Sequence, residues 1–338
     1  MKAMYIDAPG QVSIKDVEMP VRKEGEVLLK ILYGGICGSD LGSYRGTFAY
    51  FDYPRIPGHE FSAEVIEADE NNAYGIKPGM IVTCNPYFNC GHCYSCEHGI
   101  VNACMDNQTM GCQRDGAFQE YITMPIERVY DGKGMAAIEP FCISYHGVSR
   151  ANVKEGDKVL VVGAGTIGVL AAIAAKAKGA TVYISDVSAG KLEMAKDFGV
   201  DGTLLNDSPE NFEKGVAEIT NGNGFDVTIE AVGLPSTFQN CIDACCFGGR
   251  MVLIGVGKKN LDFNFTLIQK ELNVFGSRNA LKKDFLELID IVNAGKAPLH
   301  KIITNTYAFD DAAKAFDDFA HNPGDMLKVV FDFSKISK

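Results

Sequence analysis

The feature that most constrains this chain is a glycine-rich turn between an apolar strand and an alanine-rich helix. Lys158–Val162 is apolar after its first residue and leads directly into Gly163-Ala164-Gly165-Thr166-Ile167-Gly168. The first glycine allows a tight turn, the second lets the backbone approach a pyrophosphate, and the third lets helix and strand pack closely. Free N–H groups at the helix start attract phosphate. This order predicts a dinucleotide-binding βαβ unit.

Asp186 ends the next predicted strand, residues 181–185, 18 positions after Gly168. A carboxylate there can accept the hydroxyls of the adenosine ribose and would repel a 2′-phosphate, which favours NAD over NADP. Lys191 could reach the same ribose, although an ordinary solvated helix lysine explains it equally well. The alternative is a glycine-tolerant turn followed by an incidental exposed aspartate.

Strands and helices alternate through the middle of the chain. Helices are predicted at about 166–178 and 189–198, and further strands at 226–232, 250–254 and 271–276. This alternation predicts a parallel sheet with right-handed crossovers. The first third instead has short alternating segments typical of an all-β domain, and the tail has two helical patterns and a last strand. These segments are 27–32, 61–66 and 80–83, then 283–293, 310–319 and 328–333.

Length and charge limit the function classes. A chain of 338 residues favours two domains. The formal net charge of −11 disfavours nucleic-acid binding. The first residues lack an apolar stretch typical of a signal peptide, and the uncharged run 159–175 is broken by glycines, so we expect no membrane span. The sequence therefore predicts a cytoplasmic protein.

Four of the eleven cysteines cluster as Cys90-x2-Cys93-x2-Cys96-x7-Cys104. In a reducing compartment such clustering indicates a metal rather than disulfides. Four thiolates around one zinc ion leave no open coordination position, so the pattern predicts a structural zinc site. An iron–sulfur cluster is the rival interpretation, and a zinc-ribbon binding module is an alternative for the whole chain.

A second set of candidate ligands is dispersed along the sequence. Cys37 lies in Gly35-Ile36-Cys37-Gly38-Ser39-Asp40, His59-Glu60 follow a glycine, and Glu139 precedes a proline. Taken singly, each has an ordinary explanation as a buried thiol, a core histidine or a surface acid. Their spacing alone does not assign a site.

The motifs taken together resemble the zinc-dependent medium-chain dehydrogenase/reductases, most closely the polyol and sugar-acid branch typified by sorbitol dehydrogenase. The segment 270–278, KELNVFGSR, also resembles bacterial relatives that oxidise hexonates such as galactonate or gulonate. The motifs besides the four-cysteine segment are GGICGSD at 34–40, PGHEFSAEV at 57–65, DGAFQEY at 115–121, EP at 139–140 and GAGTIG at 163–168.

The resemblance implies an α/β fold. A GroES-like β domain would comprise residues 1–148 and 277–338. A Rossmann domain with a doubly wound parallel sheet, residues 149–276, would be inserted into it, with the catalytic cleft between the two. Relatives associate through the Rossmann sheet edge, which implies a homodimer or homotetramer.

The resemblance also implies a reaction, in which hydride passes from a secondary alcohol of a polyol or sugar acid to NAD and leaves a ketone. Cys37, His59 and Glu60 would bind a catalytic zinc ion, in addition to the structural one. Glu139 would either exchange with Glu60 as a ligand or hold a water. A zinc-free reductase or crystallin-like relative is the alternative.

Further roles follow from the same resemblance. Ser39 would accept the substrate proton, and Asp40 would hydrogen-bond His59 and fix its tautomer. Many relatives continue the proton relay with a histidine where this chain has Gly42. Arg278 would pair with a substrate carboxylate or contact the cofactor pyrophosphate, and Tyr44 is a weaker substrate-contact candidate. The predicted cofactor contacts are Gly163, Gly165, Ile167, Gly168, Asp186, Lys191, Gly255, Val256 and Ser277.

Overall fold

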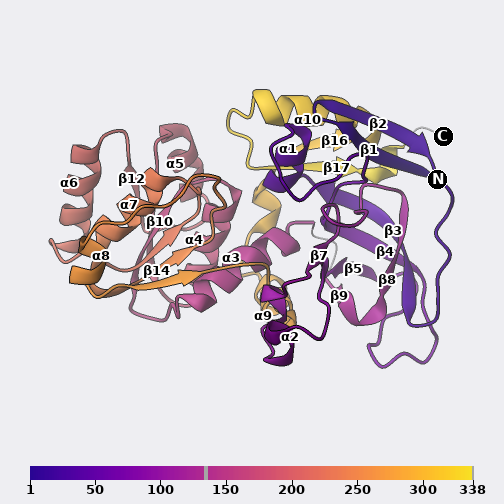
Figure 1. The fold of residues 1–338 in the computed structure, drawn as a ribbon, viewed down its shortest axis with the longest axis horizontal. Helices are drawn as coiled ribbons and strands as arrows, with labels where there is room; N and C mark the ends of the chain where they lie inside the picture. Colours follow the sequence, from indigo (N-terminus) through magenta and orange to yellow (C-terminus); the bar gives the residue numbers. More distant parts are fainter. Residues whose placement is uncertain (133–135, 337–338) are drawn as a thin grey trace. The chain divides into compact units, whose positions relative to one another are not determined.

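The computed structural model describes residues 1–132 and 136–336, which divide into two compact units (Figure 1). Unit 1 comprises Met1–Glu139, Leu281–Asp290 and Leu299–Lys338, and unit 2 comprises Pro140–Ala280 and Ile291–Pro298. The divisions differ from the predicted boundaries at 148/149 and 276/277. One helix, α3 (Ile138–Arg150), runs across the first predicted boundary without a break.

Unit 2 contains a parallel sheet in the strand order β12-β11-β10-β13-β14-β15. Numbered from β10, this is the doubly wound order 3-2-1-4-5-6. The predicted α/β class and Rossmann sheet are confirmed. The strands are β10 (Lys158–Val162), β11 (Thr181–Asp186), β12 (Gly202–Leu205), β13 (Phe225–Glu230), β14 (Cys245–Leu253) and β15 (Asn273–Gly276). The helices are α4 (Thr166–Ala177), α5 (Ala189–Lys196), α6 (Pro209–Thr220), α7 (Pro235–Ala244) and α8 (Thr266–Gln269).

The uncharged run 159–175 forms β10, the glycine turn and most of α4. The side chains of residues 159–162 in β10 are branched and almost fully buried, as expected for a central parallel strand. A Cβ on Gly168 would lie 1.7 Å from the carbonyl oxygen of Gly163, so α4 can start this close to β10 only with glycine there. Among the helices of residues 1–132 and 136–336, none has the length and apolar character needed to cross a bilayer.

Unit 1 is built on a mixed sheet in the order β16-β17-β3-β4-β5-β9, with β8 also paired to β3. Its C-terminal strand β17 pairs antiparallel with β3, so the tail of the chain completes the N-terminal sheet. The sheet strands are β3 (Glu26–Gly35), β4 (Glu60–Glu67), β5 (Ile81–Cys84), β8 (Tyr121–Pro125), β9 (Val129–Asp131), β16 (Ile303–Ala308) and β17 (Lys328–Asp332). Two further pairs are β1 (Lys2–Ala8) with β2 (Gln11–Asp16) and β6 (Tyr87–Phe88) with β7 (Gln108–Thr109). The helices are α1 (Gly38–Tyr44), α2 (Tyr94–Glu97), α9 (Lys282–Asn293) and α10 (Ala312–His321).

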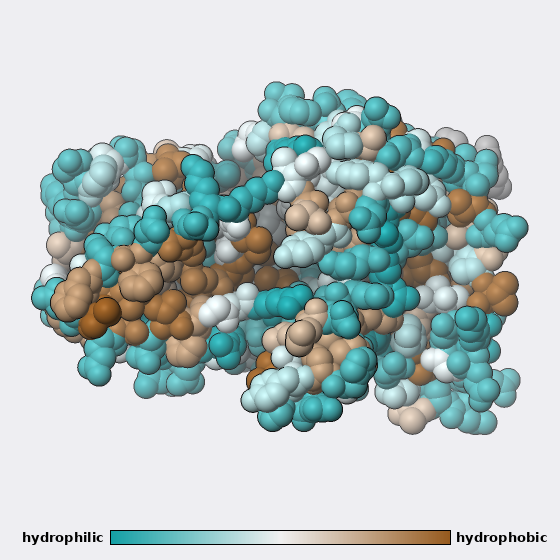
Figure 2. Space-filling model, viewed as in Figure 1, coloured by the Kyte–Doolittle hydropathy of each residue, from teal (hydrophilic) through white to brown (hydrophobic). Residues whose placement is uncertain are grey.

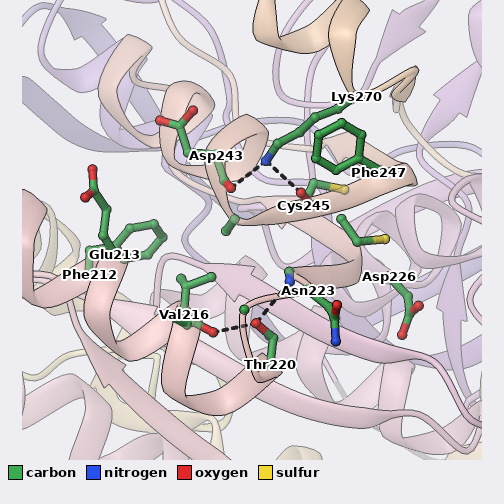
Figure 3. A pocket seen from close by; sticks show the side chains of 15 residues that line it. Phe212, Glu213, Val216, Thr220, Asn223, Asp226, Asp243, Cys245, Phe247 and Lys270 are labelled. Atoms are coloured by element: carbon green, nitrogen blue, oxygen red, sulfur yellow. Dashed lines mark hydrogen bonds between the residues drawn. The ribbon is translucent and has the colours of Figure 1, made fainter.

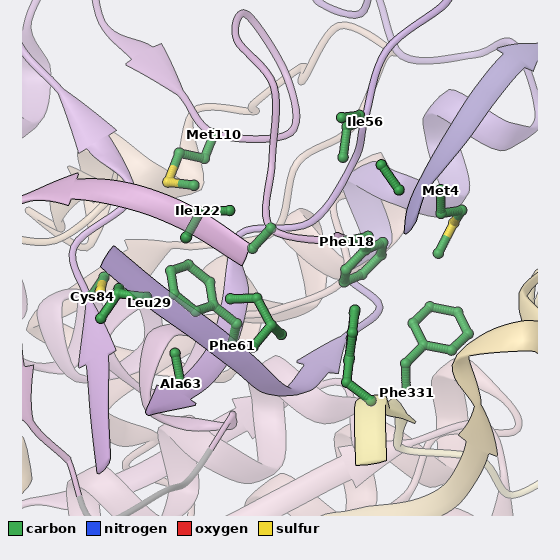
Figure 4. Packing of buried hydrophobic residues seen from close by; sticks show 14 of the residues in the cluster. Met4, Leu29, Ile56, Phe61, Ala63, Cys84, Met110, Phe118, Ile122 and Phe331 are labelled. Carbon is green, nitrogen blue, oxygen red and sulfur yellow. The ribbon is translucent and has the colours of Figure 1, made fainter. Parts of the chain in front are cut away.

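The core of unit 1 fixes the segment before His59. Phe118 and Phe331 are buried and meet edge to face, with ring centroids 5.1 Å apart (Figure 4). Gly58 lies against this pair with a φ of 97°, and a Cβ on it would lie 2.4 Å from the Phe118 ring. Only glycine tolerates both the backbone angle and this contact. The aromatic core therefore sets the path of the chain into His59.

Candidate active site

Cys37, His59 and Glu60 converge at one end of the unit 1 sheet. Cys37 follows β3 and precedes α1, while Glu60 opens β4 and pairs in register with Gly35 of β3. One ligand atom from each of the three side chains lies within 4.8 Å of the other two. His59 and Glu60 are buried. One sulfur, one imidazole and one carboxylate form a donor set that suits zinc and leaves a coordination position for a substrate, so the residues fit this ion.

Asp40 orders the backbone on both sides of this cluster. One carboxylate oxygen accepts the Cys37 N–H at 2.9 Å and the other accepts the Gly58 N–H at 3.3 Å. The nearest approach to His59 Nδ1 is 4.0 Å, which is an ion-pair distance and not the predicted hydrogen bond. The predicted hydrogen bond is corrected because Asp40 lies too far from His59 for one, and the Asp40 oxygens instead accept the two backbone amides. Asp40 thus holds the two segments that carry the ligands.

Charge is concentrated in this buried site. Burial alone would lower the pKa of His59, but the neighbouring Cys37 and Asp40 raise it well above its usual value. Burial raises the pKa of Glu139 to about 7. The Tyr87 hydroxyl donates a hydrogen bond to Glu139, an interaction that the sequence did not suggest. Glu139 is an electrostatic neighbour of His59 and Glu60 but lies outside the group within 4.8 Å.

Lys328 is a further residue of the site that sequence reasoning missed. Its ammonium donates to both oxygens of Glu60, at 2.9 and 2.6 Å. The two residues are 268 positions apart in the sequence, and no motif spacing links them. The only available signal was the position of this lysine at the start of an apolar C-terminal strand.

The four predicted structural cysteines also come together. The Cys104 sulfur lies 3.5 Å from that of Cys90 and 3.9 Å from that of Cys93. A tetrahedral ion about 2.3 Å from each sulfur would separate the sulfurs by about 3.8 Å, so the set fits one zinc ion. Backbone N–H groups of Met105 and Cys96 lower the pKa of Cys93 to about 6, which favours the thiolate that a metal binds.

The glycine turn of unit 2 forms an open cradle. Gly163 has a φ of 107°, and a Cβ on Gly165, at the start of α4, would meet nothing within 4 Å. Asp186 accepts the Ala164 N–H at 2.7 Å and the Ser188 N–H at 2.9 Å, which holds its carboxylate beside the turn. A free helix start next to a fixed carboxylate fits a dinucleotide. Ile167 and Lys191 are half-buried on the adjoining helices.

The predicted contacts Gly255 and Val256 lie in the loop after β14. A Cβ on Gly255 would lie 2.3 Å from the Gly233 nitrogen, so this loop touches the one after β13. The buried Glu230 carboxylate accepts the N–H groups of Val232 and Gly233 and orders the second loop. No sequence motif indicated this role of Glu230. These loops follow the carboxyl ends of their strands, where doubly wound sheets bind ligands.

Ser277 and Arg278 follow β15, the last strand of the same sheet. The Ser277 N–H donates to the Leu253 carbonyl at 3.0 Å, and Arg278 is exposed. Both residues therefore lie just beyond the carboxyl end of β15, next to the end of β14. Ser277 and Arg278 therefore lie at the end of the unit 2 sheet where the dinucleotide is predicted to bind.

Tyr44 packs against the C-terminal helix α10. Its buried ring lies 5.4 Å from that of Phe316 on this helix. Burial and the nearby Asp317 raise the pKa of its hydroxyl. The structure therefore gives Tyr44 a packing contact, and its predicted substrate contact stays a prediction.

Gly42 is closely packed. A Cβ at this position would lie 3.2 Å from the Phe48 Cβ. Phe48 therefore takes the space next to the position at which many relatives carry a histidine. Ser39, half-buried in the first turn of α1, remains the candidate proton acceptor.

A cavity of about 810 Å³ lies at the other end of the unit 2 sheet, where β13 and β14 begin (Figure 3). Phe212, Val216, Thr220, Cys245 and Lys270 are among its lining residues, which include none of the predicted site residues. The Lys270 ammonium donates to the carbonyls of Asp243 and Cys245 at 2.7 and 2.8 Å. Since it also reaches the Ile242 carbonyl, this lysine caps the end of α7 and has a structural role.

Comparisons with known proteins agree with this geometry. The alcohol dehydrogenase GroES-like domain family matches residues 23–133, and the zinc-binding dehydrogenase family matches residues 166–294. L-galactonate-5-dehydrogenase of Escherichia coli K12 is 33% identical over 98% of this chain and 99% of its own length. Sorbitol dehydrogenase of Halalkalibacterium halodurans is 31% identical over 95% of each chain.

The solved structure of an alcohol dehydrogenase from Escherichia coli CFT073, in complex with NADH, matches with a TM-score of 0.90. It is 32% identical in sequence, and the match covers 98% of this chain and 99% of that one. These matches extend over both units of the chain. The chain is an oxidoreductase of the zinc-type medium-chain dehydrogenase family and belongs to its polyol and sugar-acid branch.

Proposed function

We propose that this enzyme oxidises a secondary alcohol of a polyol or sugar acid to a ketone, with NAD as the hydride acceptor and two zinc ions per chain. The observation that carries the proposal is the convergence of Cys37, His59 and Glu60. The names of the relatives, L-galactonate-5-dehydrogenase and sorbitol dehydrogenase, support a polyhydroxylated substrate. The four-cysteine set supports a second, structural ion.

When bound, zinc supplies the Lewis acidity that lowers the pKa of an alcohol hydroxyl, and NAD accepts the hydride. The residues of the chain hold the ligands and move the proton. Asp40 fixes the segments that carry Cys37 and His59. Ser39 would accept the proton of the substrate and pass it toward the nicotinamide ribose. Because Phe48 packs on Gly42, the proton would then leave through water or another residue.

The preference for NAD rests on Asp186. Its carboxylate is held beside the glycine turn by two backbone N–H groups. In that position it would accept ribose hydroxyls and repel the 2′-phosphate of NADP. Lys191 could contact the same ribose. An ordinary solvent-exposed helix lysine explains this residue equally well.

The identity of the substrate rests on Arg278. A guanidinium pairs bidentately with a carboxylate, which would favour sugar acids over neutral polyols. Contact with the pyrophosphate of the cofactor is the alternative, because Arg278 follows β15 at the ligand-binding end of the sheet. The two roles predict different kinetics.

We also propose a homodimer or homotetramer. In unit 2, β15 is the last strand of the sheet order, and an unpaired edge strand invites pairing with another chain. Figure 2 shows an apolar patch over α8 and β14, close to this edge. Exposed apolar side chains there are Phe263, Phe265, Ile268 and Val274. A reducing compartment such as the cytoplasm would keep all eleven cysteines as the thiols found in the structure.

The test is a screen for NAD reduction over polyols, hexonates and threonine, together with a metal count. We expect turnover of polyhydroxylated substrates and two zinc ions per chain. Cys37→Ser should remove turnover and one ion, while Cys246→Ser, a control at a half-buried thiol of unit 2, should keep both. Full turnover by Cys37→Ser, or by a preparation stripped of metal, would reject the mechanism.

A further inference from the structure

Glu60 and Lys328 form a buried ion pair inside the metal-binding group. Lys328 is 4% exposed and Glu60 is 1% exposed. The ammonium donates to Glu60 Oε1 at 2.9 Å, to Glu60 Oε2 at 2.6 Å and to the Ile36 carbonyl at 3.1 Å. An ammonium has three N–H donors, and these three acceptors match them. Lys328 is therefore fully engaged within the site.

The backbone brings this pair together. Lys328 is the first residue of β17, which pairs with the end of β3, and Glu60 is the first residue of β4, on the other side of β3. The β3 residue between them is Gly35. A Cβ on Gly35 would lie 2.6 Å from Glu60 Oε2 and 3.5 Å from Lys328 Cδ. The pair can therefore form across β3 because position 35 has no side chain.

A buried carboxylate needs a compensating charge, and removal of its only partner is costly. Lys328 supplies that charge to Glu60. A zinc ion on Glu60 brings a second cation to the same carboxylate. The ion and the ammonium repel each other, and the repulsion is stronger in a buried site than in water.

We propose that Lys328 is a positioning residue that competes with zinc for the Glu60 carboxylate, so that it stabilises the metal-free site and weakens metal binding there. The inference rests on the proposed function, because it takes Glu60 as a zinc ligand. Lys328 thereby sets how tightly the catalytic ion is held, whereas Cys37 and His59 set where it binds.

The experiment is a double-mutant cycle in which zinc affinity is measured by chelator competition. The protein used holds zinc at the four-cysteine site and none at the site of Cys37, His59 and Glu60. Lys328→Met removes the ammonium and retains most of the side-chain volume. We expect it to bind zinc about tenfold more tightly than the wild type, and in the Glu60→Gln background the same substitution should change affinity by less than about threefold. Without the second ion, Lys328→Met should melt at a lower temperature than the wild type, and zinc should restore it.

Two variants serve as controls. Lys328→Arg keeps the charge and should stay within about threefold of the wild-type affinity. Lys77→Met removes the same charge from an exposed turn and should change neither affinity nor melting temperature. If Lys328→Met does not fold without zinc, Lys328→Gln, which also removes the charge, is measured in its place with the same expected gain of about tenfold in affinity.

The contrary outcomes are distinct. An equal gain in affinity in both backgrounds would show that Lys328 acts only as a nearby charge, and an unchanged or weaker affinity of Lys328→Met would overturn the competition. If the wild type binds no ion beyond the four-cysteine site, the proposed function fails as well. If the wild type binds the second ion and all the Lys328 variants bind it with the wild-type affinity, only the inference about Lys328 fails.

Discussion

Gly35 lies against Glu60 so closely that a Cβ on Gly35 would be 2.6 Å from Glu60 Oε2. Gly35→Ala should displace this carboxylate, weaken zinc binding about tenfold or more and lower the free energy of unfolding by about 1–3 kcal/mol. Chelator competition and urea unfolding measure the two effects. Gly38→Ala is the matched control, because a Cβ there meets nothing within 4 Å. Equal behaviour of the two variants would contradict the assigned packing.

The four-cysteine site should be structural. Cys104→Ser removes a buried sulfur that lies within 3.9 Å of two others. We expect the loss of one zinc ion per chain and a lower melting temperature, because the energy of a structural metal site is folding energy. Metal analysis and thermal denaturation test this. Cys112→Ser, a buried thiol outside the cluster, should keep both ions, and a full metal content in Cys104→Ser would refute the site.

Asp186 should determine the choice of cofactor. Asp186→Ala removes the carboxylate beside the glycine turn, so the KM for NAD should rise about tenfold to a hundredfold, as expected when one or two charge-assisted hydrogen bonds are lost. Activity with NADP should rise in parallel, because the repulsion of its 2′-phosphate is removed. Steady-state kinetics with both cofactors measure the change. An unaltered ratio of the two kcat/KM values would mean that Asp186 does not contact the ribose.

Arg278→Ala distinguishes the two roles of this arginine. If it binds a substrate carboxylate, kcat/KM for hexonates should fall about a hundredfold or more, since the loss of a bidentate charged pair costs about 3 kcal/mol. Neutral polyols should be affected far less. An equal loss for both substrate classes, together with a higher KM for NAD, would place Arg278 on the pyrophosphate.

The stabilising contribution of Asp201 to unit 2 should be lost in acid. Burial raises the pKa of Asp201, but hydrogen bonds from the Lys176 ammonium and the Val182 N–H outweigh it, so the pKa lies below its usual value. A carboxyl group whose pKa is lowered by folding stabilises the folded state fully when the pH is above its unfolded-state pKa, near 3.9. This stabilisation is lost as the pH falls through the folded-state pKa. After allowance for solvent screening of this partly exposed group, Asp201→Ala should therefore cost about 1 kcal/mol or less at pH 7, and much less at a pH below the folded-state pKa. Urea unfolding at both pH values tests this, and a constant difference would contradict it.

The sequence was most informative where structure is local. The Lys158–Val162 strand and the glycine turn were predictable because strand, turn and helix are contiguous and each residue type has a distinct backbone role. β12 (Gly202–Leu205) was not predicted, since this edge strand has one buried side chain and begins with glycine. The division near residue 139 differs from the predicted boundary at 148/149, and α3 runs through that predicted boundary without a break.

The metal ligands themselves came from recognisable motifs, but their partners did not. Lys328 contacts Glu60, which lies 268 residues away in the sequence, because their strands are both paired with β3. Tyr87 contacts Glu139, 52 residues away, at the start of α3. The hydrogen-bond partner predicted for Asp40 was wrong, because the sequence cannot show which backbone amides its carboxylate accepts. The packing of Tyr44 on Phe316 of α10 was not predictable, because it depends on the return of the C-terminal segment.

The negative charge of the two proposed metal sites is balanced in different ways. The Lys328 ammonium donates to both oxygens of Glu60, whereas residues 89–105 contain no lysine or arginine. A chain without zinc would therefore keep a counter-charge at Glu60, while the four-cysteine segment would have none of its own.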